Sequence, residues 1–305
     1  MPDVSYVLLQ KLIRKGALRI DGKRVKTDTR LIPGQQVKIP AAGSGKKIQY
    51  ESKISAKDKA YIKSLVIYDE GDIIALNKPA GLAVQGGSKT FTHVDGLLDG
   101  LKNEQGVRPK LVHRLDKDTS GLLLLARSTK MARRLGDAFK SRNVKKTYVA
   151  LVKGVPEVKE GTIKASIEKS GGLNRERMRV NEETGKTAIT EYTVIDTMGS
   201  DLASIAFWPR TGRTHQLRVH AEIAGFSIVG DNKYRGHSSE ADEILEGLDL
   251  ADRLHLHALR IAMPHPSGHG TLEIEAPLSL EMKKSWQTAG FDPRLTYDPF
   301  ENIKT

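Results

Sequence analysis

Residues 113–121 place acidic, basic and hydroxyl side chains directly before an apolar run. They read HRLDKDTSG, and the run LLLLA follows at residues 122–126. A short apolar run after a glycine is typical of a strand buried on both faces. A carboxylate at the end of such a strand costs free energy unless another group compensates it. Asp116 is therefore a candidate for catalysis, although a surface loop in which Asp118 or Thr119 caps local backbone would explain the same residues.

A second basic segment, residues 210–220, reads RTGRTHQLRVH. It predicts a turn and then a helix that is capped by Thr214 and ends at Gly225. The helical period separates polar from apolar residues, so Arg218 can point to a cleft while the other face packs. The two faces are His215, Arg218 and Glu222, and Leu217, Ala221 and Ala224. Taken alone, this pattern is more typical of a solvated helix face.

The first segment resembles the catalytic motif of the RluA-type pseudouridine synthases. Four other segments are similar to motifs of that family and follow in the family's order. They are residues 77–82 (NKPAGL), 145–148 (KKTY), 210–220 and 253–258 (RLHLHA). Residues 81–88 (GLAVQGGS) are most similar to the branch called ribosomal large-subunit synthase C. Several motifs in one order are far more specific than a single match.

The resemblance implies an RNA pseudouridine synthase, which breaks the C1′–N1 bond of uridine, turns the base and rejoins it through C5. Asp116 would act on the ribose, as nucleophile at C1′ or as base at C2′, and the sequence leaves both roles open. Since burial raises the pKa of a carboxylate, a cation must keep Asp116 ionised, and Arg218 matches the family's partner. Tyr148 would stack on the target base, and Arg114 would fill the gap left by the flipped nucleotide.

The resemblance also implies further RNA contacts around this site. Arg213 is expected to meet a phosphate or to support its loop, and Leu256 to line the base pocket. The remaining expected RNA-binding residues are His113, next to Arg114 in the sequence, and Lys11, Arg14 and Lys15 near the N-terminus. The reaction uses no redox or energy source, so we expect neither a metal nor another cofactor.

Four histidines leave a metal site open as an alternative. His255 and His257 share one face of a predicted strand, and His265 and His269 follow. Histidine pairs at such spacings can bind zinc, but no matching carboxylate motif accompanies these.

The elements that would position the site alternate between strands and helices. Residues 73–76, 147–152 and 203–207 predict strands, and apolar side chains between 131 and 139 predict a helix capped by Ser128 or Thr129. This mixture indicates an α+β fold with a largely antiparallel sheet. The resemblance implies the pseudouridine synthase fold, whose central mixed sheet is bent and carries the active-site cleft. Residues 237–252 are acidic and polar and predict an inserted loop.

The first 40 residues form a small basic unit of their own. Apolar residues at helical spacing precede Gly16, Asp21 and Gly22 predict a hairpin, and Pro33 and Gly34 predict a further turn. The unit resembles a truncated S4-like RNA-binding domain that lacks its usual first helix. A basic surface element packed on the enzyme is the alternative. Residues 41–60 predict a linker, and residues 61–305 the catalytic domain.

Composition narrows the choice of partner. The 305 residues include 49 Lys and Arg against 37 Asp and Glu, a net charge of +12 that favours a polyanion. There is no cysteine, which excludes disulfides, thiolate catalysis and cysteine-bound zinc. No apolar run approaches the roughly 18 residues of a membrane span, so we expect a cytoplasmic protein without a membrane partner.

Three functions fit these residues. We expect isomerisation of specific uridines in large-subunit ribosomal RNA, with no obligate protein partner. A synthase acting on transfer RNA would use the same catalytic residues. A non-catalytic RNA-binding factor in ribosome assembly could use the same fold, and substitution of Asp116 would separate it from an enzyme.

Overall fold

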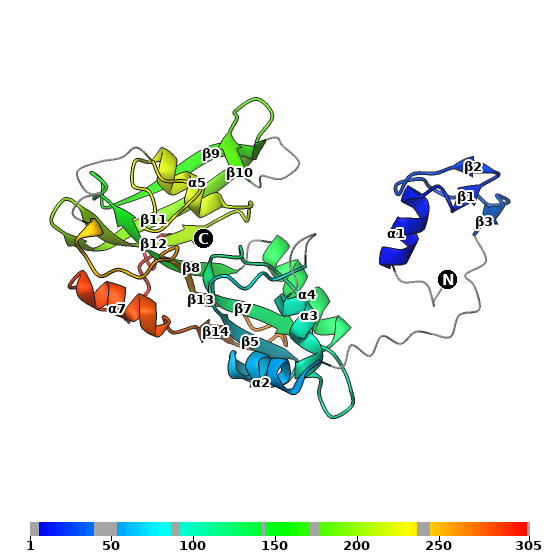
Figure 1. Cartoon of the computed structure of the whole chain (residues 1–305), viewed down its shortest axis with the longest axis horizontal. Coiled ribbons are helices and arrows are strands. Elements are labelled where there is room, and N and C mark those ends of the chain that lie inside the picture. Colours follow the sequence, from blue (N-terminus) through cyan, green and yellow to red (C-terminus); the bar gives the residue numbers. More distant parts are fainter. Residues whose placement is uncertain are drawn as a thin grey trace. The chain divides into compact units, whose positions relative to one another are not determined.

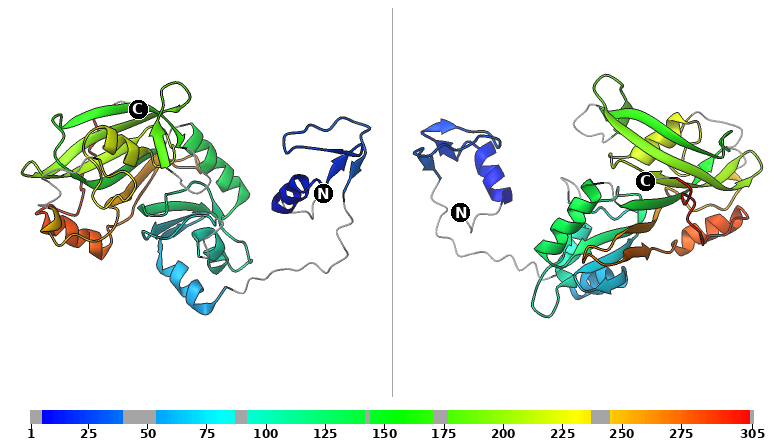
Figure 2. Two further views of the ribbon diagram at one scale, coloured as in Figure 1. Left: turned by 45° about the horizontal axis from the view of Figure 1, so that its top comes forward. Right: turned by 180° about the vertical axis from the view of Figure 1, so that it is seen from behind.

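The computed structural model describes residues 6–39, 54–86, 92–141, 144–170, 177–236 and 245–303, with the side chains of residues 6–8 and 11 outside that description. The chain separates into two compact units, Met1–Lys53 and Ile54–Thr305. Each unit contains its own β-sheet, and the two are described separately below (Figures 1 and 2). In the described part, no helix is long and apolar enough to cross a membrane.

The first unit combines one helix with a small antiparallel sheet. Helix α1 spans Tyr6–Arg14, and the strands are β1 (Arg19–Ile20), β2 (Lys23–Arg24) and β3 (Val37–Lys38) in the order β2-β1-β3. Asp21 and Gly22 form the hairpin turn with positive φ angles of 48° and 77°. The predicted helix, hairpin and further turn at Pro33 and Gly34 are therefore confirmed, while the likeness to an S4 domain stays a prediction. Arg14 and Lys15 are exposed, and the side chain of Lys11 lies outside the described part.

The second unit is built on an 11-stranded sheet, counted over the described residues. Its strands are β4 (Val66–Glu70), β5 (Ile73–Lys78), β6 (Lys110–Leu111), β7 (Ser120–Ala126), β8 (Lys145–Lys153), β9 (Glu160–Ser170), β10 (Arg177–Val180), β11 (Lys186–Met198), β12 (Leu202–Pro209), β13 (Leu256–Pro264) and β14 (Thr271–Glu275). The order is β10-β9-β11-β12-β8-β13-β7-β5-β4, with β14 on β13 and β6 on β7. Figure 1 shows β9–β12 in one half of this unit and β5 and β7 in the other.

Helices and one 3-10 segment accompany this sheet. They are α2 (Ala56–Ser64), α3 (Val94–Leu97), η1 (Leu98–Leu101), α4 (Thr129–Lys140), α5 (Gln216–Ile223) and α7 (Leu280–Thr288). The described strand pairs are antiparallel except β7 with β13, which is parallel. The predicted α+β class and the mixed, mostly antiparallel sheet are therefore confirmed. The predicted cap of α4 is also confirmed, because the Ser128 hydroxyl accepts a hydrogen bond from the Met131 N–H.

The predicted linker extends too far toward the C-terminus. Helix α2 begins at Ala56, where the Ser55 hydroxyl accepts a hydrogen bond from the Asp58 N–H. Its Ile62 is fully buried in the main core, so this helix belongs to the second unit. Residues 41–53 of the linker, and residues 237–244 of the predicted loop, lie outside the described part.

Strand β7 is the centre of the part that carries the candidate site. All seven of its residues are buried, as its apolar run predicts, and it lies between β5 and β13. Residues 113–119 lead directly into its N-terminal end. A loop that enters a strand fixed on both sides has little freedom there, so the sheet determines where Asp116 lies.

We expect Gly121→Ala to destabilise the second unit by more than about 1 kcal/mol, because the site needs a positive φ and has no room for a methyl group. Gly121 has a φ of 109°, and a Cβ there would lie 2.2 Å from the Ala258 carbonyl oxygen on β13. Urea unfolding followed by tryptophan fluorescence measures this, since Trp208 and Trp286 both belong to this unit.

Gly136→Ala is the matched control. Gly136 lies in helix α4, and a methyl group added there would meet no atom within 4 Å, so alanine should stabilise the helix by about 0.5–1 kcal/mol. Equal unfolding midpoints for Gly121→Ala and the unsubstituted protein would contradict the expected clash with β13.

Candidate active site

A pocket of about 560 Å³ collects most of the residues that the sequence singled out. Its wall comes from the loop before β7, from β8, from the segment leading into α5, and from the start of β13. The predicted site residues that line it are His113, Arg114, Asp116, Tyr148, Arg213, Arg218 and Leu256. Segments more than 100 residues apart in the sequence therefore meet at one cavity.

Asp116 is partly accessible from this pocket, with 20% of its side chain exposed. Its Oδ2 atom lies 4.0 Å from Nε2 of His215, whose side chain is 5% exposed. The carboxylate can therefore be reached by a molecule bound in the cavity, and either expected role at a ribose requires this access.

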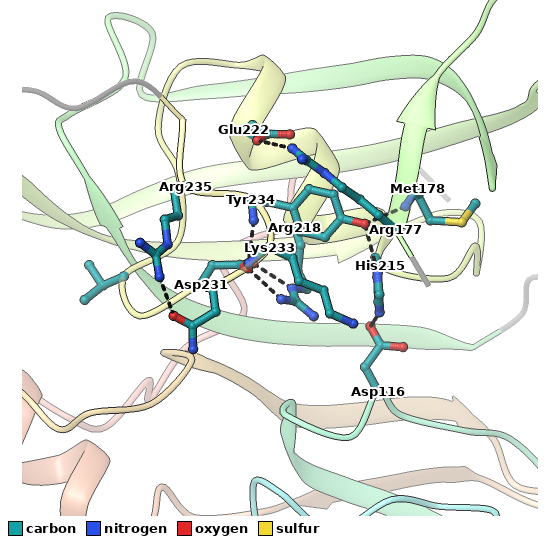
Figure 3. A network of polar contacts seen from close by, with 12 residues as sticks. Asp116, Arg177, Met178, His215, Arg218, Glu222, Asp231, Lys233, Tyr234 and Arg235 are labelled. Carbon is teal, nitrogen blue, oxygen red and sulfur yellow. Dashed lines mark hydrogen bonds and ion pairs between the residues drawn. The ribbon is translucent and has the colours of Figure 1, made fainter. Parts of the chain in front are cut away.

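Arg218 pairs with a different carboxylate from the one expected. Its Nε and Nη2 atoms donate to Asp231 Oδ2 and Oδ1 at 2.6 and 2.5 Å. The expectation of a direct ion pair with Asp116 is thus corrected, because the fully buried Asp231 carboxylate takes the guanidinium fork (Figure 3). Burial lowers the pKa of Arg218, but the hydrogen bonds and charge of Asp231, and then the charge of Asp116, outweigh it and raise the pKa.

Asp231 also organises the chain after α5. Its Oδ1 atom accepts hydrogen bonds from the backbone N–H groups of Lys233 and Tyr234 at 2.8 and 3.0 Å. The sequence reading missed both Asp231 and Tyr234. A signal for Asp231 was present in the sequence. Like Asp116, it is an acidic residue close to an apolar segment, here Ile228 and Val229, where a carboxylate is costly to bury without a partner.

Helix α5 begins later than predicted. His215 is its N-cap residue, and no side-chain hydrogen bond caps the helix there, so the predicted cap at Thr214 is wrong. The Gln216 side chain replaces it. Its Oε1 accepts hydrogen bonds from the Arg213 N–H and the Thr211 hydroxyl, and its Nε2 donates to the Ile189 carbonyl and the Thr190 hydroxyl. The buried amide therefore fixes the turn that leads into α5.

Tyr148 lies on β8 with its side chain at the pocket. Burial, and next the charge of Asp116, raise the pKa of its phenol, so it carries its proton at neutral pH. Leu256, at the start of β13, is buried and lines the same cavity. A neutral aromatic ring and an aliphatic side chain beside a carboxylate suit a planar, uncharged base.

The basic residues of the two loops differ in their surroundings. His113 accepts a hydrogen bond from the Leu124 N–H at 2.8 Å and stacks on Phe139, and burial lowers its pKa to about 3. It therefore supports its loop as a neutral ring. Arg213 donates to the Thr187 carbonyl at 3.3 Å, while Arg114 is exposed at the pocket.

Lys78 joins the 77–82 segment to the loop of Asp116. Its fully buried ammonium group donates to the carbonyls of Pro79, Leu82 and Lys117 at 2.9–3.0 Å. Burial lowers its pKa to about 7, against the opposing charges of Asp118 and Asp116. Since Lys117 directly follows Asp116, these bonds fix the backbone beside the carboxylate.

The pocket also contains three basic residues that were not predicted, Lys140, Lys146 and Arg210. Burial lowers the pKa of Lys146 to about 8, and no carboxylate among the described residues offsets it. Arg210 stacks on Trp208 with its Cζ 4.1 Å from the ring centre, and its buried Nη1 has no partner in the described part. A sequence pattern does not distinguish basic residues of a pocket from surface residues that form ion pairs, because the distinction depends on which residues surround them in the fold.

Packing of the sheet uses both His255, which directly precedes β13, and His257, which lies on it. His257 lies 2.9 Å from both the Ser120 hydroxyl and the Ala276 carbonyl, and His255 lies 2.9 Å from the Ser285 hydroxyl. Burial lowers the pKa of both to about 4. Among the described residues, no group of three or more His, Asp or Glu side chains could hold a metal ion.

Comparison with known proteins agrees with this geometry. Residues 72–222 match the family model described as RNA pseudouridylate synthase. The solved structure named Human RNA Pseudouridylate Synthase Domain Containing 4 aligns with a TM-score of 0.65 and 26% identity, covering 77% of this chain and 97% of that one. The fold is thus that of a pseudouridine synthase.

Curated relatives cover most of the chain. A Rickettsia bellii protein named Ribosomal large subunit pseudouridine synthase C is 40% identical over 239 residues, 76% of this chain and 79% of the relative. Its Rickettsia felis namesake is 35% identical over 283 residues, covering 91% and 90%. The chain belongs to the RNA pseudouridylate synthase family, and its activity is that of an RNA pseudouridine synthase, an intramolecular isomerase.

Proposed function

We propose that this enzyme converts specific uridines of large-subunit ribosomal RNA to pseudouridine, with Asp116 acting on the ribose of a flipped-out nucleotide. The single observation that carries the catalytic part is the position of Asp116, which faces the same pocket as Tyr148 and Leu256. The ribosomal substrate is supported by the names of relatives that are 40% and 35% identical to this chain.

The pocket supplies what the isomerisation needs. The flipped uracil stacks on Tyr148 and contacts Leu256, so the base remains held after its bond to C1′ is broken. Asp116 acts at C1′ as a nucleophile or at C2′ as a base, and both roles use its carboxylate oxygens. Arg114, exposed at the rim, occupies the space that the nucleotide leaves.

The charge of the chain favours the RNA backbone. The net charge of +12 attracts a polyanion, and Lys146 and Arg210 bring cations into the pocket wall. In the first unit, the exposed Arg14 and Lys15 are proposed to add phosphate contacts to rRNA. A transfer RNA synthase would use the same catalytic residues, so the two RNA classes are separated by mapping both in cells.

We expect Lys146→Gln to weaken RNA binding and to lower the slope of log affinity against log salt by about 0.7–0.9, the value for one phosphate contact. Because burial lowers the pKa of Lys146 to about 8, the affinity of the unsubstituted enzyme should fall between pH 7 and pH 9 as this charge is lost. Filter binding or fluorescence anisotropy at several salt concentrations and pH values measures both effects.

The control is Lys130→Gln, an exposed lysine of α4 outside the pocket. This variant should keep the fall in RNA affinity between pH 7 and pH 9 that the unsubstituted enzyme shows, and it should reduce RNA affinity less than Lys146→Gln does. An unaltered salt slope for Lys146→Gln would show that its ammonium group meets no phosphate.

The function is tested by mapping pseudouridine in cells that lack this gene. Large-subunit RNA and transfer RNA are mapped after deletion, and after rescue with the unsubstituted gene or with Asp116→Asn. Sites in large-subunit RNA that return only with the unsubstituted gene are the expected result. Loss of pseudouridine confined to transfer RNA would overturn the ribosomal substrate. If deletion leaves the pseudouridine map unchanged but causes a defect in growth or ribosome assembly, the RNA-binding factor would be favoured.

A further inference from the structure

His215 has a backbone conformation that few residues adopt. Its φ and ψ are 51° and 20°, the left-handed region, and apart from the hairpin residue Asp21 it is the only described non-glycine residue with positive φ. Such a conformation costs of the order of 1–3 kcal/mol and clusters at active sites. The Gln216 amide already fixes the turn before α5, so holding that turn does not require the imidazole.

The tautomer of His215 follows from its neighbour Tyr234. The Tyr234 hydroxyl accepts a hydrogen bond from the Met178 N–H at 2.7 Å and lies 2.9 Å from Nδ1 of His215 (Figure 3). Tyr234 is fully buried, so its own hydroxyl hydrogen needs an acceptor, and among the described residues Nδ1 of His215 is the acceptor within reach. An Nδ1 that accepts leaves the ring hydrogen on Nε2.

Tyr234 is in turn fixed by the Arg218–Asp231 pair. Asp231 accepts the Tyr234 N–H, and the Arg218 guanidinium lies 5.1 Å from the centre of the Tyr234 ring. Arg177 also lies against this ring, 5.4 Å from the same centre, and pairs with Glu222. The hydroxyl therefore has one position, and Nδ1 of His215 faces it.

The other ring nitrogen faces Asp116. His215 Nε2 is 4.0 Å from Asp116 Oδ2, within about 1 Å of hydrogen-bond distance. Hydrogen bonds at catalytic groups are often long before substrate binds and shorten in the complex. Burial lowers the pKa of His215, so at neutral pH the ring is an uncharged donor. The charged and titratable groups that face it are Asp116 from the loop before β7, Arg218 from α5, and Asp231, Lys233 and Tyr234 from the chain after α5.

We propose that His215 is a positioning residue for Asp116: in the RNA complex its Nε2–H donates to Oδ2, turns Oδ1 toward the ribose and favours the ionised carboxylate. Arg218, which is bound to Asp231, acts on Asp116 only through space. The Met178–Tyr234–His215 chain supplies the directed contact that Arg218 does not make. This inference rests on the proposed role of Asp116 at the ribose.

Two substitutions of His215 distinguish the effect of its Nε2–H hydrogen bond from the effect of its imidazole ring. His215→Leu removes the donor, whereas His215→Gln carries an N–H close to the position of Nε2. Relative to the unsubstituted enzyme, we expect the leucine variant to lower kcat about 10- to 100-fold, as for loss of a hydrogen bond to a charged group, with KM little changed. In the leucine variant, the acidic limb of the pH profile of kcat/KM should move to higher pH. The glutamine variant should recover most of kcat and return the acidic limb to its original pH.

Nitrogen NMR of the full-length protein with ¹⁵N-labelled histidine gives a readout that does not depend on activity. We expect His215 to carry its hydrogen on Nε2 and to lose this fixed tautomer in Tyr234→Phe, which keeps the ring and removes the hydroxyl. A hydrogen on Nδ1, or equal losses of kcat in the leucine and glutamine variants with an unshifted acidic limb, would overturn the proposal.

The companion variant Asp116→Asn distinguishes the two proposals. If Asp116→Asn is inactive and the His215 hydrogen lies on Nδ1, only the role of His215 is overturned. If Asp116→Asn retains full activity, the role of Asp116 at the ribose is overturned, and the positioning role of His215 is overturned with it.

Discussion

Asp116→Asn is expected to lower pseudouridine formation by at least about a thousandfold while the enzyme still binds its RNA. Asparagine has nearly the same shape but no charge, so it can act neither as a nucleophile at C1′ nor as a base at C2′. General acid–base groups contribute about 10²–10⁴ to a rate, and removal of a nucleophile costs more. The measurement is single-turnover formation of pseudouridine in a large-subunit RNA transcript.

Binding should survive this substitution for structural reasons. The Asp116 side chain is partly exposed, and its one basic partner within 4.0 Å in the described part is the neutral His215. Removing a negative charge from a pocket lined by Arg114, Arg213 and Lys146 should tighten binding to an anionic RNA slightly. RNA affinity that falls together with activity would indicate a damaged pocket.

Asp118→Asn is the matched control in the same loop. Asp118 is half-buried two residues further along and does not line the pocket. The same loss of charge there should keep activity within about tenfold of the unsubstituted enzyme, less than one general acid–base contribution. A comparable loss in both variants would mean that the charge of the loop matters and not the position of one carboxylate.

Much of the scaffold could be predicted from the sequence because its signals are local. The apolar run of β7 has the pattern of a strand buried on both faces, and residues 131–139 have the period and cap of helix α4. The motifs then indicated which side chains meet at one pocket. Where these signals are weak, as at the start of α2, the predicted boundary was wrong by several residues.

The partner of Arg218 could not be predicted in this way. Sequence spacing says which face of α5 an arginine occupies, but three carboxylates lie within the electrostatic reach of Arg218, those of Asp116, Asp118 and Asp231. The fully buried one has no water to solvate it, so it gains most from the guanidinium fork. That choice depends on burial in the folded chain, which neither the helical period nor the motif contains.

The Arg218–Asp231 pair should be among the most costly to break. Both side chains are buried, with 3% and 0% exposed, so removing one partner leaves an uncompensated charge. We expect Arg218→Met and Asp231→Leu each to destabilise the second unit by about 3–5 kcal/mol. Asp137→Asn is the control, because its ion pair with Arg133 on α4 joins side chains that are 62% and 87% exposed and should contribute no more than about 0.5 kcal/mol.

The double variant Arg218→Met/Asp231→Leu distinguishes the two roles of Arg218. Replacing both members by apolar residues removes the unpaired charge, so urea unfolding should recover most of the stability lost in either single variant. Activity should not recover with it. The double variant lacks the positive charge of Arg218 that acts on Asp116. It also lacks the Asp231 carboxylate that accepts the Tyr234 N–H and so fixes Tyr234 beside His215. A double variant that regains both stability and activity would reduce the pair to a support for the fold, whereas recovered stability without activity would show that the pair also serves the reaction.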